Sequence, residues 1–271
     1  MAARDDASPK FETVLYDRKG PICYITLNRP EKLNAATDQL VEDVNDALFE
    51  FDADPDLHVA ILSGAGRAFC SGADVRYMHD CVHQGRHADA MRLLEAGNEL
   101  VRLLRGTAKP VLGSLNGPAV GGGAGIALAC DLRIASDQAS LGFVFHKLGL
   151  HPDIGSTHFL ARQVGTARAL ELFWSGRLIP AAECLALGLV NKVVPAAELE
   201  SATAEWAAWL AGLPAPAVGL SKAAVYAGES RDFSTMLDLE RANQLACFQS
   251  SDAAEGLAAY LGRRPPRFAT E

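Results

Sequence analysis

The first two-thirds of the chain alternate short apolar runs with longer stretches whose apolar residues repeat at helical period. Four of the apolar runs have the length and composition of strands; they cover residues 22–27, 59–62, 111–115 and 132–135. Turn-forming residues follow the first two runs directly. These runs therefore predict strands that end in tight turns.

Helical patterns lie between the predicted strands. Thr37 can cap a helix whose apolar positions continue to Phe51, and residues 91–104 and 124–129 are also helical windows. Strands that alternate with helices imply crossover connections, so we expect an α/β fold with a largely parallel sheet. From about Pro195 onward only helical windows remain, which predicts a core over residues 11–195 and a helical region over residues 196–271.

Composition and charge narrow the class of protein. The chain is 49% hydrophobic and 21% charged, which is ordinary for a folded protein. Its formal net charge of −8 argues against nucleic acid or a membrane surface as the main partner. The charged residues 1–10 are unlike a signal peptide, and no apolar run approaches the roughly 18 to 20 residues that span a bilayer. Six scattered cysteines without a Cys-x-x-Cys pair favour reduced thiols, so we expect a soluble cytoplasmic protein.

Two glycine-containing segments are candidates for a binding site. Residues 116–125 hold three consecutive glycines between a predicted strand and a helix, where free N–H groups can bind an anion. A Walker loop would need a lysine that is absent, and a dinucleotide fingerprint would need glycine where Ile126 stands. Residues 69–74 form a second glycine turn, but no Gly-x-Ser-x-Gly elbow surrounds Ser71. Tight packing of a strand on a helix remains the alternative for the glycine run.

The order and spacing of several motifs resemble the enoyl-CoA hydratase/isomerase (crotonase) family. The motifs are Asn28-Arg29-Pro30 with Leu33-Asn34-Ala35, residues 69–74, residues 116–123, Cys130-Asp131, Gly176-Arg177, residues 186–190 and Arg263-Arg264-Pro265. The resemblance spans roughly residues 11 to 268. It implies repeated ββα units followed by a helical trimerisation region, and a homotrimer or dimer of trimers.

The resemblance also implies an acyl-CoA thioester substrate whose enolate oxygen is stabilised by two backbone N–H groups. By motif position these belong to Ala73 and Gly122. No cofactor or metal is implied, since CoA is part of the substrate. CoA-binding residues carried over by position, together with a basic patch that we expect for the phosphates, are Arg29, Lys32, Leu33, Ala35, Asp74, Val75, Arg76, Arg263 and Arg264.

The sequence departs from the hydratase pattern at both catalytic glutamates. The position two residues after the glycine triplet is Gly125, and the second glutamate position is Phe145. Neither residue can transfer a proton. Ordinary hydration of an enoyl-CoA is therefore not the expected reaction.

One carboxylate remains in the sequence close to the second of these positions. Asp153 follows Pro152 at a place where several isomerases of the family carry an aspartate, and residues 145–153 resemble the 1,2-epoxyphenylacetyl-CoA isomerase-like branch, which also lacks both glutamates. A single carboxylate can move one proton between two carbons, and an apolar pocket would raise its pKa. A helix cap is the alternative role for Asp153.

Histidines leave further alternatives open. His146 and His151 flank Asp153 and are candidates for assisting it, whereas His79, His83 and His87 could share a helix face but lack a carboxylate to complete a metal site. We expect an isomerase acting on an unsaturated acyl-CoA. The alternatives are an enoyl-CoA hydratase or thioester hydrolase, and an acyl-CoA-binding protein that has lost catalysis.

Overall fold

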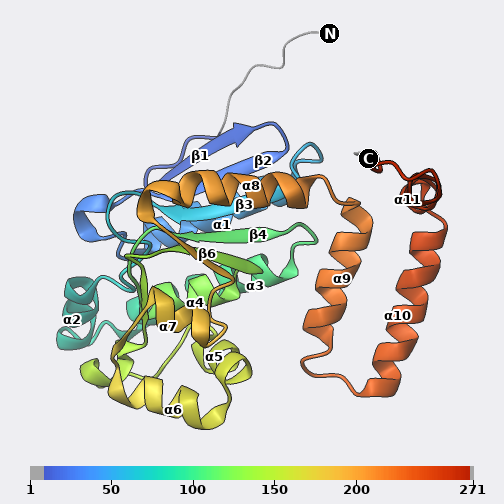
Figure 1. The fold of residues 1–271 in the computed structure, drawn as a ribbon. Coiled ribbons are helices and arrows are strands. Elements are labelled where there is room, and N and C mark those ends of the chain that lie inside the picture. Colours follow the sequence, from blue (N-terminus) through green and yellow to red (C-terminus); the bar gives the residue numbers. More distant parts are fainter. Residues whose placement is uncertain (1–8, 269–271) are drawn as a thin grey trace.

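A six-stranded sheet lies at the centre of the computed structural model, which describes residues 9–268 (Figure 1). Residues 1–8, which contain most of the segment judged unlike a signal peptide, and residues 269–271 lie outside the described part of the chain. The strands have the spatial order β1-β2-β3-β4-β6-β9. Their bounds are β1 (Val14–Lys19), β2 (Ile22–Leu27), β3 (Val59–Gly64), β4 (Val111–Leu115), β6 (Leu132–Ser136) and β9 (Lys192–Val194).

Strand pairing in this sheet is parallel except at one edge. Strands β1 and β2 form an antiparallel hairpin, and every later neighbour pairs in parallel. The four predicted strands are confirmed as β2, β3, β4 and β6. The edge strand β1 was not predicted, because exposed charged residues interrupt its apolar pattern.

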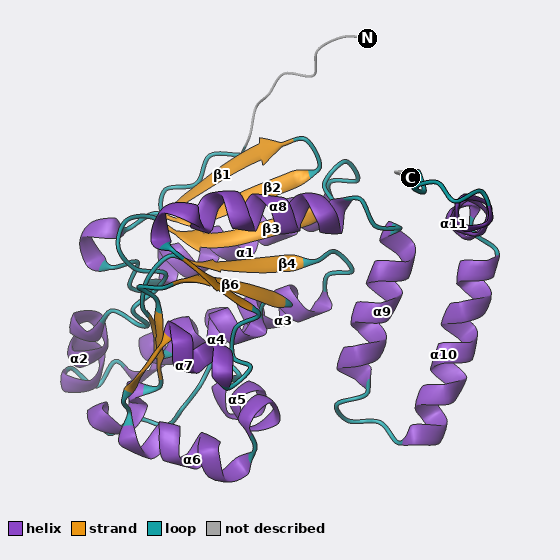
Figure 2. Ribbon diagram, viewed as in Figure 1, coloured by secondary structure: helices purple, strands orange, loops and turns teal. Residues whose placement is uncertain are grey.

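The sheet is buried on both faces. On β3, Ala60 and Leu62 join the apolar cluster of α1, α3 and α4, whereas Val59 and Ile61 join the cluster of α8. Figure 2 shows α8 lying along one face of the sheet. A strand covered on both sides needs apolar residues at successive positions, which explains why β3 is a continuous apolar run in the sequence.

Helices make up most of the remaining chain. Helix α1 begins after Thr37, whose hydroxyl accepts a hydrogen bond from the amide of Leu40 at 3.3 Å, so the predicted cap is confirmed. The bounds are α1 (Asp38–Ala53), α2 (Val75–His83), α3 (His87–Gly106), α4 (Gly122–Ala129), α5 (Ser156–Val164), α6 (Thr166–Ser175), α7 (Ala181–Ala186), α8 (Leu199–Ala211), α9 (Ala215–Ala227), α10 (Phe233–Phe248) and α11 (Ser251–Leu261). None of the described helices is both long and apolar enough to cross a membrane.

A second, three-stranded sheet lies next to α4. It has the order β5-β7-β8, with bounds β5 (Ala119–Val120), β7 (Ser140–Gly142) and β8 (Leu178–Pro180). Strand β5 ends one residue before Gly121, which precedes α4. The small sheet therefore fixes the N-terminus of α4 relative to the segments that follow β7.

The last three helices extend away from the sheet (Figure 1). No residue of α9, α10 or α11 belongs to either apolar cluster of the described core. Helix α8, by contrast, packs on the sheet as part of that core. The all-helical end of the chain is thus divided between one helix on the sheet and an arm of three helices.

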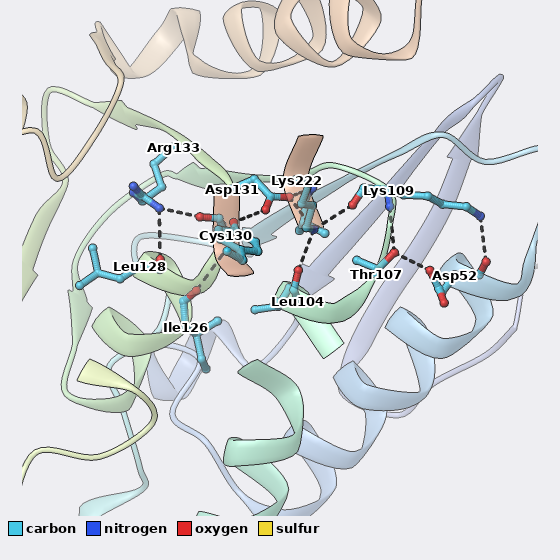
Figure 3. A network of polar contacts seen from close by, with 12 residues as sticks. Asp52, Leu104, Thr107, Lys109, Ile126, Leu128, Cys130, Asp131, Arg133 and Lys222 are labelled. Carbon is cyan, nitrogen blue, oxygen red and sulfur yellow. Dashed lines mark hydrogen bonds and ion pairs between the residues drawn. The ribbon is translucent and has the colours of Figure 1, made fainter. Parts of the chain in front are cut away.

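Polar contacts attach this arm to the core (Figure 3). The ammonium of Lys222, on α9, donates to Asp131 Oδ2 at 2.8 Å and to the carbonyl oxygens of Leu104 and Lys109 at 2.9 and 3.0 Å. Tyr226 donates its hydroxyl to the other oxygen of Asp131. The Lys222 side chain is only 7% exposed. Its ammonium is therefore stabilised by the Asp131 carboxylate and the two carbonyl oxygens in place of water.

Replacing Lys222 by methionine is expected to lower the free energy of unfolding by about 3 kcal/mol, because it leaves the Asp131 carboxylate half-buried without its cation. Urea unfolding measures this change. The control is Lys19→Met, since Lys19 is 57% exposed and lies 3.9 Å from its partner Asp17. Equal stability of the two variants would contradict the role of Lys222.

Candidate active site

A cavity of about 140 Å³ lies between α2, α3, the N-terminus of α4 and the segment after β7. Asp153 carries the single ionisable side chain among its described lining residues, and Ser71 adds one hydroxyl. The rest of the wall is apolar and includes Met78, Leu93, Leu94, Ile126, Phe145 and Leu148. An apolar cavity with few polar groups is the usual form of a small-molecule site.

Two main-chain amides reach this cavity from separate loops, at Ala73 and Gly122. Ala73 is bridged to Ala36, which donates its N–H to the carbonyl of Gly72 at 2.7 Å and accepts the N–H of Asp74 at 2.9 Å. These bonds fix the loop while the N–H of Ala73 itself has no backbone acceptor among the described residues. Gly122 opens α4, where the first N–H groups have no acceptor within the helix. Neither amide therefore has a main-chain acceptor among the described residues, and both belong to residues that line the cavity.

Glycines allow the two loops to approach each other. A β-carbon built on Gly72 would lie 2.8 Å from the carbonyl oxygen of Val120, and one on Gly123 would lie 2.2 Å from that of Cys70. Both distances are too short for any side chain. In addition, Gly121 has a φ of 57°, which glycine adopts without strain. The close approach places two N–H donors, one of them at a helix N-terminus, on a single cavity.

Asp153 lies on the wall of the same cavity, before α5. Burial raises the pKa of its carboxyl from 3.8 to about 6, although its own main-chain amide and His151 offset part of this effect. No side chain of the described residues pairs with the carboxyl. Helix α5 follows Gly155 without a side-chain cap, so the alternative of a helix cap at Asp153 is wrong. Its own main-chain amide is thus the one hydrogen-bond partner that the described residues give this carboxyl.

The turn after Asp153 has an unusual backbone. Ile154 has a φ of 48°, although a β-branched side chain is rare in the left-handed region. Such a conformation costs about 1–3 kcal/mol and persists where the surroundings enforce it. Ile154 is buried and lines the cavity next to Asp153.

The same turn explains the missing side chain at Gly125. A β-carbon there would lie 2.5 Å from the carbonyl oxygen of Ile154 and 3.0 Å from Oγ of Ser156. The second expected glutamate position, Phe145, is buried and contributes an aromatic ring to the cavity wall. Neither position offers a proton-transferring group to the cavity.

The two candidate histidines lie outside the cavity wall. His146 and His151 are exposed, and neither is among the described lining residues. His151 acts on Asp153 only through its charge, which lowers the pKa of that carboxyl. The other three histidines do not share one helix either, since His79 and His83 lie on α2 and His87 begins α3. No group of three potential metal ligands occurs among residues 9–268.

The predicted CoA-binding loop, residues 29–35, is held by one buried amide. The Asn34 side chain donates to the carbonyls of Ala68 and Phe69 at 2.8 and 3.1 Å and accepts the N–H of Arg29 at 2.9 Å. Lys32 is exposed, whereas Leu33 is partly buried and Ala35 is buried. Asn34 is a residue whose positioning role the sequence did not indicate.

At the start of α2, Asp74 is the helix cap and accepts from the amide of Arg76 at 3.0 Å. Val75 and Arg76 are exposed beside it, and Val75 also lines the cavity. The remaining basic pair, Arg263 and Arg264, follows α11, far from α2 in the same chain (Figure 1). Arg264 pairs there with Glu255 at 2.6 Å. One copy of the chain thus does not bring these two arginines to the cavity.

Comparison with known proteins finds relatives over almost the whole chain. A family model described as enoyl-CoA hydratase/isomerase matches residues 17–271. A short-chain-enoyl-CoA hydratase from Clostridium acetobutylicum is 34% identical over 94% of this chain and 97% of its own length. A 1,2-epoxyphenylacetyl-CoA isomerase from Escherichia coli is 36% identical over 95% of this chain and 98% of its own length.

Solved structures give the same result. An enoyl-CoA hydratase from Bacillus anthracis superimposes with a TM-score of 0.89 and 33% identity, covering 96% of this chain and all of its own. The fold is the crotonase fold, as the sequence motifs predicted. The chain belongs to the enoyl-CoA hydratase/isomerase family.

Substituting Gly125 tests the packing of the turn. We expect Gly125→Ala to lower the free energy of unfolding by about 2 kcal/mol or more, because its methyl group meets a main-chain oxygen that cannot move freely. Thermal or urea unfolding measures the loss. Gly106→Ala is the matched control, since no atom lies within 4 Å of a β-carbon there. A stable Gly125→Ala variant would show that the turn yields more readily than this packing implies.

Proposed function

We propose that this chain is an isomerase of unsaturated acyl-CoA thioesters, which moves one proton between two carbons of the acyl group. The observation that carries the proposal is the pairing of one carboxyl, Asp153, with the amides of Ala73 and Gly122 on a single apolar cavity. Proton transfer needs no redox or metal group, so CoA enters only as part of the substrate.

The two amides would stabilise the enolate. When a proton leaves the carbon next to the thioester carbonyl, negative charge moves onto the carbonyl oxygen. Fixed N–H donors aimed at that oxygen stabilise the transition state more than the neutral substrate. Each such donor is typically worth about 3 kcal/mol, and the α4 N-terminus adds a favourable dipole.

Asp153 would carry the proton. Its carboxylate takes the proton from the α carbon of a β,γ-unsaturated thioester and becomes a neutral acid. It then returns the proton to the γ carbon, so the double bond moves to the α,β position and the carboxylate is restored. The raised pKa of about 6 suits a group that must both accept and release a proton near neutrality.

Water addition is less well supported by the site. The family's hydratases use two glutamates, and this chain has Gly125 and Phe145 at those positions. The turn at Ile154 fills the space beside Gly125. One carboxylate with no second proton-transfer group fits migration of a proton better than activation of water.

The CoA portion would lie along residues 29–35 and the start of α2, where Arg29, Lys32 and Arg76 supply positive charge. The helical arm provides the expected assembly surface of a trimer or dimer of trimers. In a single copy of the chain, its apolar side chains that are at least 67% exposed include Phe233, Phe248, Tyr260 and Leu261. Assembly through this arm would carry Arg263 and Arg264 toward a neighbouring copy.

The Asp153→Asn variant is expected to keep its affinity for acyl-CoA and lose exchange of α and γ protons by about 100-fold or more. A panel of acyl-CoAs in deuterated water, analysed by mass spectrometry, measures both exchange and product. The matched controls His146→Gln and His151→Gln are expected to retain exchange. Unchanged turnover in Asp153→Asn, or loss of the conjugated absorbance of crotonyl-CoA with the wild-type protein, would contradict the proposal.

The pH dependence of kcat/KM is expected to have an acidic limb near pH 6. Asp153 must be ionised to take the α proton, so activity falls about tenfold per pH unit below its raised pKa and levels above it. Initial rates between pH 4.5 and 8 would locate this limb. A limb near pH 4, the ordinary range of an aspartate, would show that Asp153 is not the titrating base.

A further inference from the structure

The side chain of Ile154 packs against a glycine of each of two helices. A β-carbon on Gly97, in α3, would lie 2.6 Å from Cδ1 of Ile154, and one on Gly122, in α4, would lie 3.3 Å from its Cγ1. Outside their own helices, Ile154 is the only described residue within 4 Å of either point. The isoleucine side chain therefore closes the space between α3 and α4 where both helices have no side chain of their own.

This side chain lies next to the reacting groups. Gly122 carries one of the two amides of the cavity, and Asp153 is the preceding residue. In extended backbone, successive side chains point to opposite sides, but the left-handed turn at Ile154 brings Asp153 and Ile154 to the same cavity. The residue after the carboxyl thus forms part of the wall that an acyl group would meet.

We infer that Ile154 determines how large an acyl group the site accepts, by forming the wall of the cavity at Gly97. This inference rests on the proposed function, because it takes the cavity as the acyl site. A cavity of about 150 Å³ holds one benzene molecule, so the present volume of about 140 Å³ fits an acyl group of one six-membered ring or about six carbons. The apolar wall selects acyl groups without charged or hydroxyl substituents.

Binding of saturated acyl-CoAs tests this wall without any chemistry. Calorimetric titration with butanoyl-, hexanoyl-, octanoyl- and decanoyl-CoA is expected to show wild-type affinity rising about fourfold per methylene up to about six carbons, and then levelling. Ile154→Ala removes three carbons from the wall. The rise should then continue for about two further carbons, which improves octanoyl-CoA affinity relative to hexanoyl-CoA by about 16-fold.

Matched variants distinguish a change in this cavity wall from a general loosening of the protein core. Ile134→Ala removes the same three carbons from the apolar cluster on the other face of the sheet, at a residue that does not line the cavity, and the chain-length limit should stay in place. Adding Gly97→Ala to Ile154→Ala fills the opened space and should restore the limit near six carbons. Ile154→Val, a smaller change, should move the limit in the same direction and serves where Ile154→Ala does not fold.

The outcomes decide the inference. An unchanged limit in folded Ile154→Ala and Ile154→Val variants, an equal shift in Ile134→Ala, or no restoration by Gly97→Ala overturns it. A wild-type affinity that is independent of acyl length overturns both the inference and the use of this cavity for the acyl group. If the length limit moves as expected while Asp153→Asn still exchanges protons, the isomerase proposal fails and the role of Ile154 stands.

Discussion

The close approach of two main-chain segments is the constraint on which the candidate site depends. Cys70 and Gly72 on one side meet Val120 and Gly123 on the other at distances that leave no room for a β-carbon on either glycine. The parallel bridge of Cys70 with Ala119 fixes the same contact. Because of this contact, Ala73 in the loop and Gly122 at the helix N-terminus line one cavity.

In the proposed mechanism, one turn would supply the proton-transfer group that the family resemblance assigns to two glutamates in hydratases. The main chain of Ile154 occupies the space beside Gly125, so a long side chain at that position and this turn exclude each other. In exchange the turn brings the carboxyl of Asp153 into the cavity, where burial raises its pKa to about 6. The strained backbone of Ile154 keeps a carboxyl and an apolar wall on the same cavity, which is the arrangement that the proposed proton transfer requires.

The sequence predicted the strands and helices whose burial imposes a regular pattern of apolar residues. Strands such as β3 were predictable because burial on both faces demands an uninterrupted apolar run, and α1 because Thr37 and a one-sided apolar stripe define it. The small sheet was not, since strands of two or three residues are too short to carry a period.

In the site, the resemblance to the family indicated the amides of Ala73 and Gly122 as well as the carboxyl of Asp153. The positive φ of Ile154 and the contact with Gly97 depend on residues far apart in the sequence, and no local pattern records them. The placement of His146 and His151 outside the cavity wall is likewise a property of the folded chain.

In the proposed mechanism, Asp153 carries one proton from the α to the γ carbon, and an isotope label follows that proton. A 3-enoyl-CoA deuterated at the α carbon, converted in ordinary water during a single turnover, should give a 2-enoyl-CoA with part of the deuterium at the γ carbon. A product that contains oxygen from water and no transferred deuterium would contradict the account.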